Sequence, residues 1–237
     1  MQIERDGNGH TDTSDRLIRG VKTDRVYRIL LCDVEGTLTG YRLAKLAQTE
    51  QTHVSLIIRD LEKSSLVRGT RVTDHKGLLA RWSRLHVKYQ SQSYMLPDVL
   101  RVLKNTGLEY GLTTYRAESM VNRYLFPSKT ELYIRGADFE AWHALLVKEG
   151  ALVGGGNVRL RWYDDQVLYN SFSIDGYRMV SVPQLIVDLL REVGSAVEAA
   201  NMMMQKYAEL LTLNRLHSVS PFPVGTYKTK VGRRVSR

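Results

Sequence analysis

Two adjacent carboxylates, Asp164 and Asp165, are the first residues in this sequence that could do chemistry. A metal-binding pair of aspartates on one strand needs same-face spacing, because neighbouring side chains of a strand point to opposite faces. These two residues lack that spacing, and aspartate is typical of turns. We therefore interpret them as the turn of a β-hairpin over residues 157–172. The glycines at 154–156 lack the Gly-Lys-Ser/Thr ending of a phosphate-binding loop and also indicate a turn.

The other potential nucleophiles and metal ligands are scattered along the chain. Cys32 is the only cysteine, which excludes an internal disulfide and a multi-cysteine zinc site, and we expect it in the core. The histidines show no ligand spacing: His10, His53, His75, His86, His143 and His217. The sequence therefore predicts no catalytic residue, no metal and no cofactor, and we expect a protein that is not an enzyme.

Basic residues are concentrated in two segments. The formal net charge of the chain is +9. Residues 41–88 carry ten basic and four acidic side chains, a net charge of +6, and residues 228–237 add five basic side chains. A polyanionic partner explains such localisation better than solubility does, although a solvated basic face is the simpler alternative.

The basic segment belongs to a stretch with regular hydrophobic spacing. Apolar residues from Val26 to Val34 recur with a helical period, and Thr39 can cap a second helix. A third helix is predicted over residues 52–63, and LVRGTRV (66–72) predicts two short strands around Gly69. A further helical pattern follows, so that the order is helix, helix, turn, helix, hairpin, helix. We expect a winged helix-turn-helix, a DNA-binding module, over residues 23–90.

The predicted third helix has two distinct faces. Its packing stripe consists of Val54, Ile57, Ile58 and Leu61, and its opposite stripe consists of Thr52, Ser55, Leu56, Arg59 and Lys63. A recognition helix needs such a division, because one face packs on its domain while the other enters the major groove. The predicted DNA-contacting residues of the whole module are Tyr41, Arg42, Lys45, Thr52, His53, Ser55, Arg59, Lys63, Arg68, Thr70 and Arg71.

The remaining segments complete the predicted organisation. Residues 1–22 are polar and indicate a flexible arm, and residues 91–93 indicate a linker. Strand and helix patterns alternate over residues 94–212, which predicts a small mixed α/β domain. Residues 213–237 indicate a basic tail. The predicted fold class is thus α+β, with a winged helix-turn-helix followed by the α/β domain.

The C-terminal half resembles the AbiEi-type antitoxins, which are transcriptional regulators of type IV toxin–antitoxin systems. The family's final Ser-x-Pro-Gln-Leu-x-x-Asp-Leu helix is matched by Ser181, Pro183, Gln184, Leu185, Asp188 and Leu189. An earlier Thr-Gly-x-x-Ala-like motif is matched by Thr113, Thr114 and Ala117, with Thr114 at the position where glycine is usual. The resemblance implies a winged helix-turn-helix before an α/β domain, repression of the protein's own operon, and a partner toxin that resembles a nucleotidyltransferase.

These observations favour a DNA-binding transcriptional regulator, whose C-terminal domain serves protein interaction or effector response. A stand-alone regulator of the same architecture fits the residues equally well, and a homodimer is compatible with it. Two alternatives are a winged-helix module that docks a partner protein and a nucleotidyltransferase-like domain. No apolar run reaches the roughly 18 residues of a membrane span, and the N-terminus lacks a secretory signal. We therefore expect a cytoplasmic protein that binds double-stranded DNA and no membrane.

Overall fold

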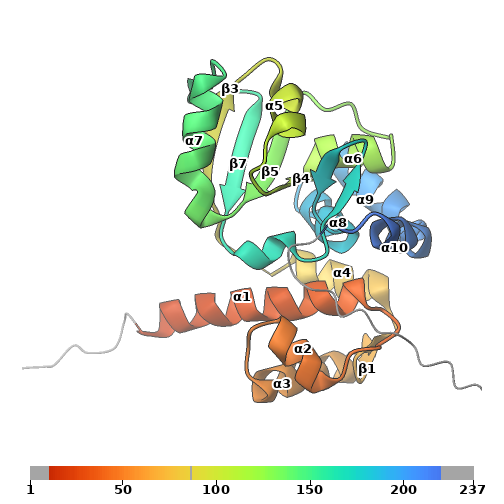
Figure 1. Ribbon diagram of the computed structural model, residues 1–237. Helices are drawn as coiled ribbons and strands as arrows, with labels where there is room; N and C mark the ends of the chain where they lie inside the picture. The colour runs from red at the N-terminus through yellow and green to blue at the C-terminus, as the bar shows by residue number, and fades with distance from the viewer. Residues whose placement is uncertain (1–10, 86, 220–237) are drawn as a thin grey trace, which may run out of the picture.

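The computed structural model describes residues 11–85 and 87–219 of the chain and has a mixed α+β fold (Figure 1). The N-terminal half forms a layer of helices below the sheet in Figure 1. Its elements are α1 (Thr11–Cys32), α2 (Gly40–Leu46), α3 (Gln51–Lys63), β1 (Val67–Arg68), β2 (Arg71–Val72) and α4 (His75–Ser83).

The C-terminal half is built on a seven-stranded mixed sheet of order β6-β3-β7-β5-β4-β9-β8. Its strands are β3 (Gln90–Met95), β4 (Tyr110–Thr113), β5 (Thr130–Ile134), β6 (Leu152–Val153), β7 (Val158–Trp162), β8 (Phe172–Ile174) and β9 (Tyr177–Met179). Its helices are α5 (Val99–Asn105), α6 (Thr114–Val121), η1 (Gly136–Asp138), α7 (Phe139–Lys148), η2 (Asp165–Leu168), α8 (Val182–Leu190), α9 (Ser195–Gln205) and α10 (Tyr207–Leu216). Helix α8 packs on β4 and also on α1 and α4, so it joins the two halves.

The first helix starts at Thr11, so the predicted flexible arm is wrong for residues 11–22. The prediction relied on polar composition. The segment contains no proline, however. Once a helix is anchored by its packed part, each further residue that becomes ordered adds one backbone hydrogen bond, so the helix can extend into a polar segment. Residues 1–10 of the predicted arm lie outside the described residues. At the other end, α10 includes the first residues of the predicted tail, and residues 220–237 lie outside the described residues.

Two further predictions are wrong for the C-terminal half. The predicted linker at 91–93 belongs to β3, which pairs antiparallel with β7. The predicted hairpin over residues 157–172 does not form, because β7 pairs with β3 and β5 while β8 pairs with β9. The segment between β7 and β8 contains the 3₁₀ helix η2. Alternating apolar residues identified β7 as a strand, but they carry no information on which strand lies beside it.

A buried ion pair lies where the two halves meet. Asp24 and Arg28 are both fully buried on α1 and form a salt bridge with each other. The Trp82 indole on α4 donates to the Asp24 carboxylate at 2.6 Å, while Arg28 donates to the side-chain oxygens of Gln184 at 2.9 Å and Gln166 at 3.0 Å. Burial alone would lower the pKa of Arg28, but Asp24, Tyr163 and Asp164 together raise it by more, so the guanidinium remains charged. Four separate segments are thus held by one pair of charges.

The polar network continues from α8 into the sheet. The Gln184 amide donates to the Asp188 carboxylate at 2.9 Å, and the Thr113 hydroxyl at the end of β4 donates to it at 2.6 Å. Tyr133 on β5 adds a third donor at 3.3 Å. Burial raises the pKa of Asp188, and Arg191 together with Arg161 opposes that rise. The network therefore fixes α8 on the sheet as well as on α1.

Thr114, the first residue of α6, has a strained backbone. Its φ is +49°, which lies in the left-handed region that is unfavourable for a β-branched residue. The side chain is fully buried, and its hydroxyl donates to Glu131 on β5 at 2.9 Å. The strain is thus accompanied by a buried hydrogen bond that glycine could not make.

We predict that Arg28→Met strongly destabilises the fold, because it leaves the Asp24 carboxylate buried without its cation. The free energy of unfolding should fall by about 3–5 kcal/mol, as measured by urea denaturation. Arg101→Met is the control, since it breaks an exposed pair with Glu149, and exposed pairs are worth about 0–1 kcal/mol. Equal losses for the two variants would contradict the role of the ion pair.

We also predict that stability falls in the alkaline range. Burial raises the pKa of the Cys32 thiol to about 11 and raises the pKa of four phenols above their ordinary value, namely Tyr133, Tyr163, Tyr169 and Tyr207. The unfolded chain releases these protons at lower pH than the folded chain, so each group costs about 1.4 kcal/mol per pH unit in that window. Urea titrations at increasing pH should show this slope, and Tyr207→Phe should reduce it. A free energy of unfolding that stays constant would rule the prediction out.

Candidate nucleic-acid interface

Helix α3 presents one apolar and one polar face. Val54, Ile57 and Leu61 are buried against the N-terminal layer. The opposite side is exposed to solvent and consists of Thr52, Ser55, Leu56, Arg59 and Lys63. Leu56 is 61% exposed, so an apolar side chain lies among the polar ones. The structure therefore leaves the whole predicted outer stripe of this helix accessible.

Helix α2 precedes α3 and also turns its predicted residues outward. The Thr39 hydroxyl accepts from the Arg42 amide at 3.3 Å and caps the N-terminus of the helix. Tyr41, Arg42 and Lys45 are exposed, while the apolar side of α2 packs on α1 and α3. The exposed side of α2 therefore adds one aromatic and two basic side chains to this surface.

The two-stranded hairpin pairs Val67 with Val72 and Arg68 with Arg71. Its turn contains Gly69, whose φ of +59° suits glycine and whose amide donates to the Glu62 carboxylate at 2.8 Å. The predicted strands and turn are thus confirmed. The hairpin also rests on the α1–α2 loop, because the Val72 amide donates to Val34 O at 2.9 Å.

Two of the predicted DNA contacts lie differently from the rest. Thr70 is half-buried, and its hydroxyl donates to Leu38 O at 2.7 Å, so it holds the hairpin on the loop before α2. His53 is half-buried in a groove between α1 and α3. The volume of that groove is about 570 Å³, and Glu50 and Asp60 lie along it. Thr70 thus has a structural role in addition to the predicted one. The acidic groove was not predicted, because it forms between two helices that approach each other in space.

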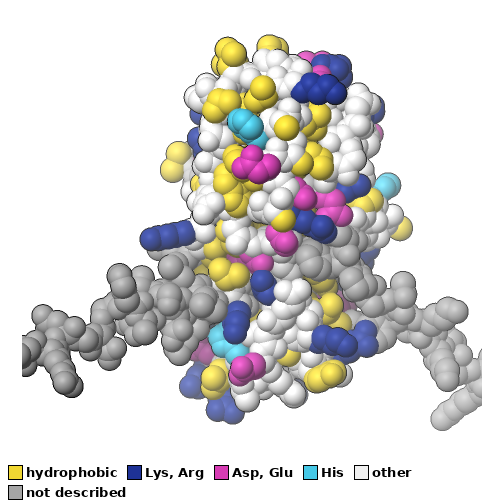
Figure 2. Space-filling model, turned by 60° about the vertical axis from the view of Figure 1, so that its left-hand side comes forward, with side chains coloured by type: hydrophobic (Ala, Val, Ile, Leu, Met, Phe, Trp, Pro, Cys, Tyr) yellow, Lys and Arg dark blue, Asp and Glu magenta, His cyan; other side chains and the backbone are white. Residues whose placement is uncertain are grey.

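The basic side chains of this region divide into two groups. Arg71 pairs with Glu35 at 3.6 Å, and Arg81 pairs with Asp60, so two positive charges are compensated locally. Exposed cations without an ion-pair or hydrogen-bond partner among the described residues include Lys45, Arg59, Lys63 and Arg68, and also Lys76 and Arg84 of the α4 segment. Figure 2 shows Lys and Arg side chains on both flanks of the lower part of the molecule, with acidic and histidine side chains between them. The uncompensated charge thus comes from α2, α3, the hairpin and the α4 segment.

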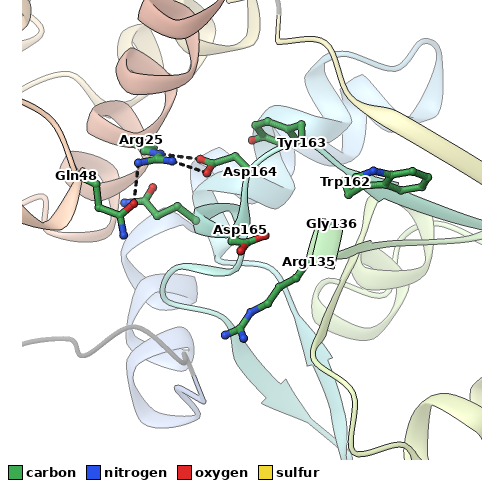
Figure 3. Close-up of a pocket in the computed structure, with 9 residues that line it drawn as sticks. Arg25, Gln48, Arg135, Gly136, Trp162, Tyr163, Asp164 and Asp165 are labelled. Carbon is green, nitrogen blue, oxygen red and sulfur yellow. Dashed lines mark hydrogen bonds and ion pairs between the residues drawn. The ribbon is translucent and has the colours of Figure 1, made fainter. Parts of the chain in front are cut away.

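A second cavity, of about 410 Å³, lies between the helical layer and the sheet (Figure 3). At its wall the Arg25 guanidinium donates to both oxygens of Asp164, at 2.8 and 2.7 Å. The partners are 139 residues apart in the chain, and no pattern in the sequence indicated that they meet. The predicted turn role of Asp164 therefore misses its main function in the fold, which is to hold α1 against the sheet.

Other kinds of site have little support in the described part of the chain. No group of three or more His, Cys, Asp or Glu residues there could hold a metal ion. None of the helices in the same part is long and apolar enough to cross a membrane. The chain matches no protein-family model, no curated protein and no solved structure.

Proposed function

We propose that the protein is a DNA-binding transcriptional regulator. The observation that carries this proposal is the two-sided α3, which buries its apolar stripe and exposes Thr52, Ser55, Arg59 and Lys63. A helix of this kind, preceded by α2 and followed by a basic hairpin, has the element order of a winged helix-turn-helix. Its outer side chains are short and polar near the N-terminus and basic further along, as major-groove binding requires.

The exposed residues suggest separate roles on the duplex. Thr52 and Ser55 lie in the first turns of α3, where side chains usually reach base edges. Arg59 and Lys63 lie further along and suit phosphate or the edge of the groove. Arg68 on the hairpin suits phosphate or the minor groove. Because these cations are unpaired, DNA binding would not have to break internal ion pairs first.

The resemblance to AbiEi-type antitoxins extends the proposal to a cytoplasmic autorepressor with a nucleotidyltransferase-like toxin as partner. Thr114 supports the resemblance, because its φ of +49° is one that glycine adopts freely, and glycine is usual at this position of the motif. The sheet domain would then serve contacts with the toxin or with an effector.

One observation favours a second candidate, a winged-helix module that docks a basic segment of another protein. Glu50 and Asp60 lie along the groove beside α3. Asp60 is paired with Arg81, but Glu50 has no ion-pair partner among the described residues, and its charge would repel a phosphate backbone. Binding that resists salt and requires no DNA would distinguish this candidate from the first.

We predict that Arg59→Ala weakens binding to duplex DNA about tenfold, because it removes a hydrogen bond to a charged phosphate, and hydrogen bonds to charged groups are worth about 1.5–3 kcal/mol. The melting temperature should stay nearly unchanged, since the Arg59 side chain is exposed and unpaired. Gel-shift titration on selected DNA measures the affinity. Lys148→Ala on α7 is the control, as it removes one exposed positive charge from the sheet domain. Unaltered affinity of Arg59→Ala would count against α3 as the binding helix.

We predict, further, that DNA affinity falls steeply as salt rises. The logarithm of the binding constant should decrease linearly with the logarithm of the salt concentration, with a slope of about −0.9 for each neutralised phosphate. Lys63→Ala should reduce that slope by about one. Fluorescence anisotropy at several salt concentrations gives the slope, and a slope near zero would reject phosphate binding.

A further inference from the structure

The C-terminal end of α2 is capped by side chains from outside the helix. The last carbonyls of a helix lack partners within it. Here Gln166, at the start of the sheet domain's η2, donates to Leu46 O at 2.8 Å, and Arg25 on α1 donates to Ala47 O at 3.2 Å. These two carbonyls stand at the beginning of the turn that leads into α3.

Each capping side chain is itself held by a further hydrogen bond: Arg25 by a residue of the sheet domain, and Gln166 by the arginine of the buried ion pair. The Arg25 guanidinium is held by the two oxygens of Asp164. The Gln166 side-chain oxygen accepts from Arg28 at 3.0 Å. Arg25 also donates to the Gln48 side-chain oxygen at 2.9 Å, within the same turn. The turn is therefore connected to the sheet domain through a short chain of hydrogen bonds.

Ala47 at the start of the turn is fully buried, whereas Gln48 borders a cavity. This cavity of about 410 Å³ has Gln48 on one wall and Trp162 and Asp165 on others (Figure 3). Gln48 follows the C-cap of α2 and has a φ of +50°, as the residue after a helix often does. The Gln48 amide donates to Lys45 O at 3.2 Å and the Thr49 amide to Ala44 O at 3.0 Å, so the end of the helix also has its own backbone cap. The hydrogen bonds from Arg25 and Gln166 add to this backbone cap, and they are the ones that connect the turn to α1 and to the sheet domain.

We propose that Asp164 and Gln166 are positioning residues for α3. Asp164 holds the α2–α3 turn through Arg25, and Gln166 holds it by its own hydrogen bond to Leu46 O. Together they set the angle at which α3 is presented. The sheet domain is then part of the DNA-reading unit, and whatever moves the segment from Asp164 to Gln166 changes DNA recognition. The effect on DNA rests on the proposed function, whereas the effect on the turn does not.

The turn itself is tested on the free full-length chain by amide hydrogen exchange. Asp164→Asn removes the charge that holds Arg25, so the hydrogen-bonded amides of residues 47–49 should exchange about tenfold faster, a typical size for coupling between sites. Asp165→Asn is the matched control, because this exposed carboxylate has no partner among the described residues and should leave exchange unchanged. Arg25→Lys keeps the charge but loses the two-pronged geometry, so it should also accelerate exchange. Unchanged protection in both Asp164→Asn and Arg25→Lys would overturn the proposal.

The consequence for recognition is tested by the ratio of specific to non-specific DNA affinity. Asp164→Asn should lower affinity for a selected sequence about tenfold and leave affinity for unrelated duplex unchanged, because the phosphate-binding cations are intact. A merely structural role would lower the melting temperature without changing this ratio, and that result would contradict positioning. If the unaltered protein binds no duplex at all, the proposed function fails, and the exchange comparison still decides whether Asp164 holds the turn.

Discussion

The buried pair of Asp24 and Arg28 is the interaction on which the rest of the structure depends. Two charges removed from water are costly unless hydrogen bonds satisfy them. Here the partners come from α4, from η2 and from α8, so satisfying the pair requires all these segments to meet. The helical layer and the sheet are consequently one unit. Helix α1, which carries both charges, serves as the base on which α2, α3 and α4 are arranged.

This arrangement explains why α3 is left open. The apolar stripes of α1, α2 and α3 pack within the helical layer, and α8 covers α1 and α4 from the sheet side. The outer side of α3 and the hairpin then remain at the far edge of the molecule (Figure 1). Arg59, Lys63 and Arg68 have no ion-pair partner among the described residues. The acidic side chains nearby have other partners: Glu62 accepts from the Gly69 amide, Asp60 pairs with Arg81 and Glu35 pairs with Arg71.

The spacing of apolar residues and the position of turn residues were sufficient to predict single helices and the short hairpin. The stripe from Val54 to Leu61 predicted α3, and Gly69 between basic and β-branched residues predicted the hairpin. Non-local pairing could not be predicted, because alternation in β7 does not identify its neighbours and nothing near Asp164 indicates Arg25. Exposure of Arg59 and Lys63 followed from helical period. The hydrogen bond of Thr70 to Leu38 O and the acidic groove could not be predicted, because each depends on a second segment that lies nearby only in the folded chain.

The central claim is that the outward face of α3, held in place by the rest of the chain, recognises duplex DNA. Selection of bound sequences from a random duplex library by the full-length protein tests it most directly. We expect a short motif to be enriched over successive rounds, and we expect simultaneous substitution of Thr52 and Ser55 by alanine to abolish that enrichment. A library that stays random with the unaltered protein, or an identical motif from the doubly substituted one, would contradict the account.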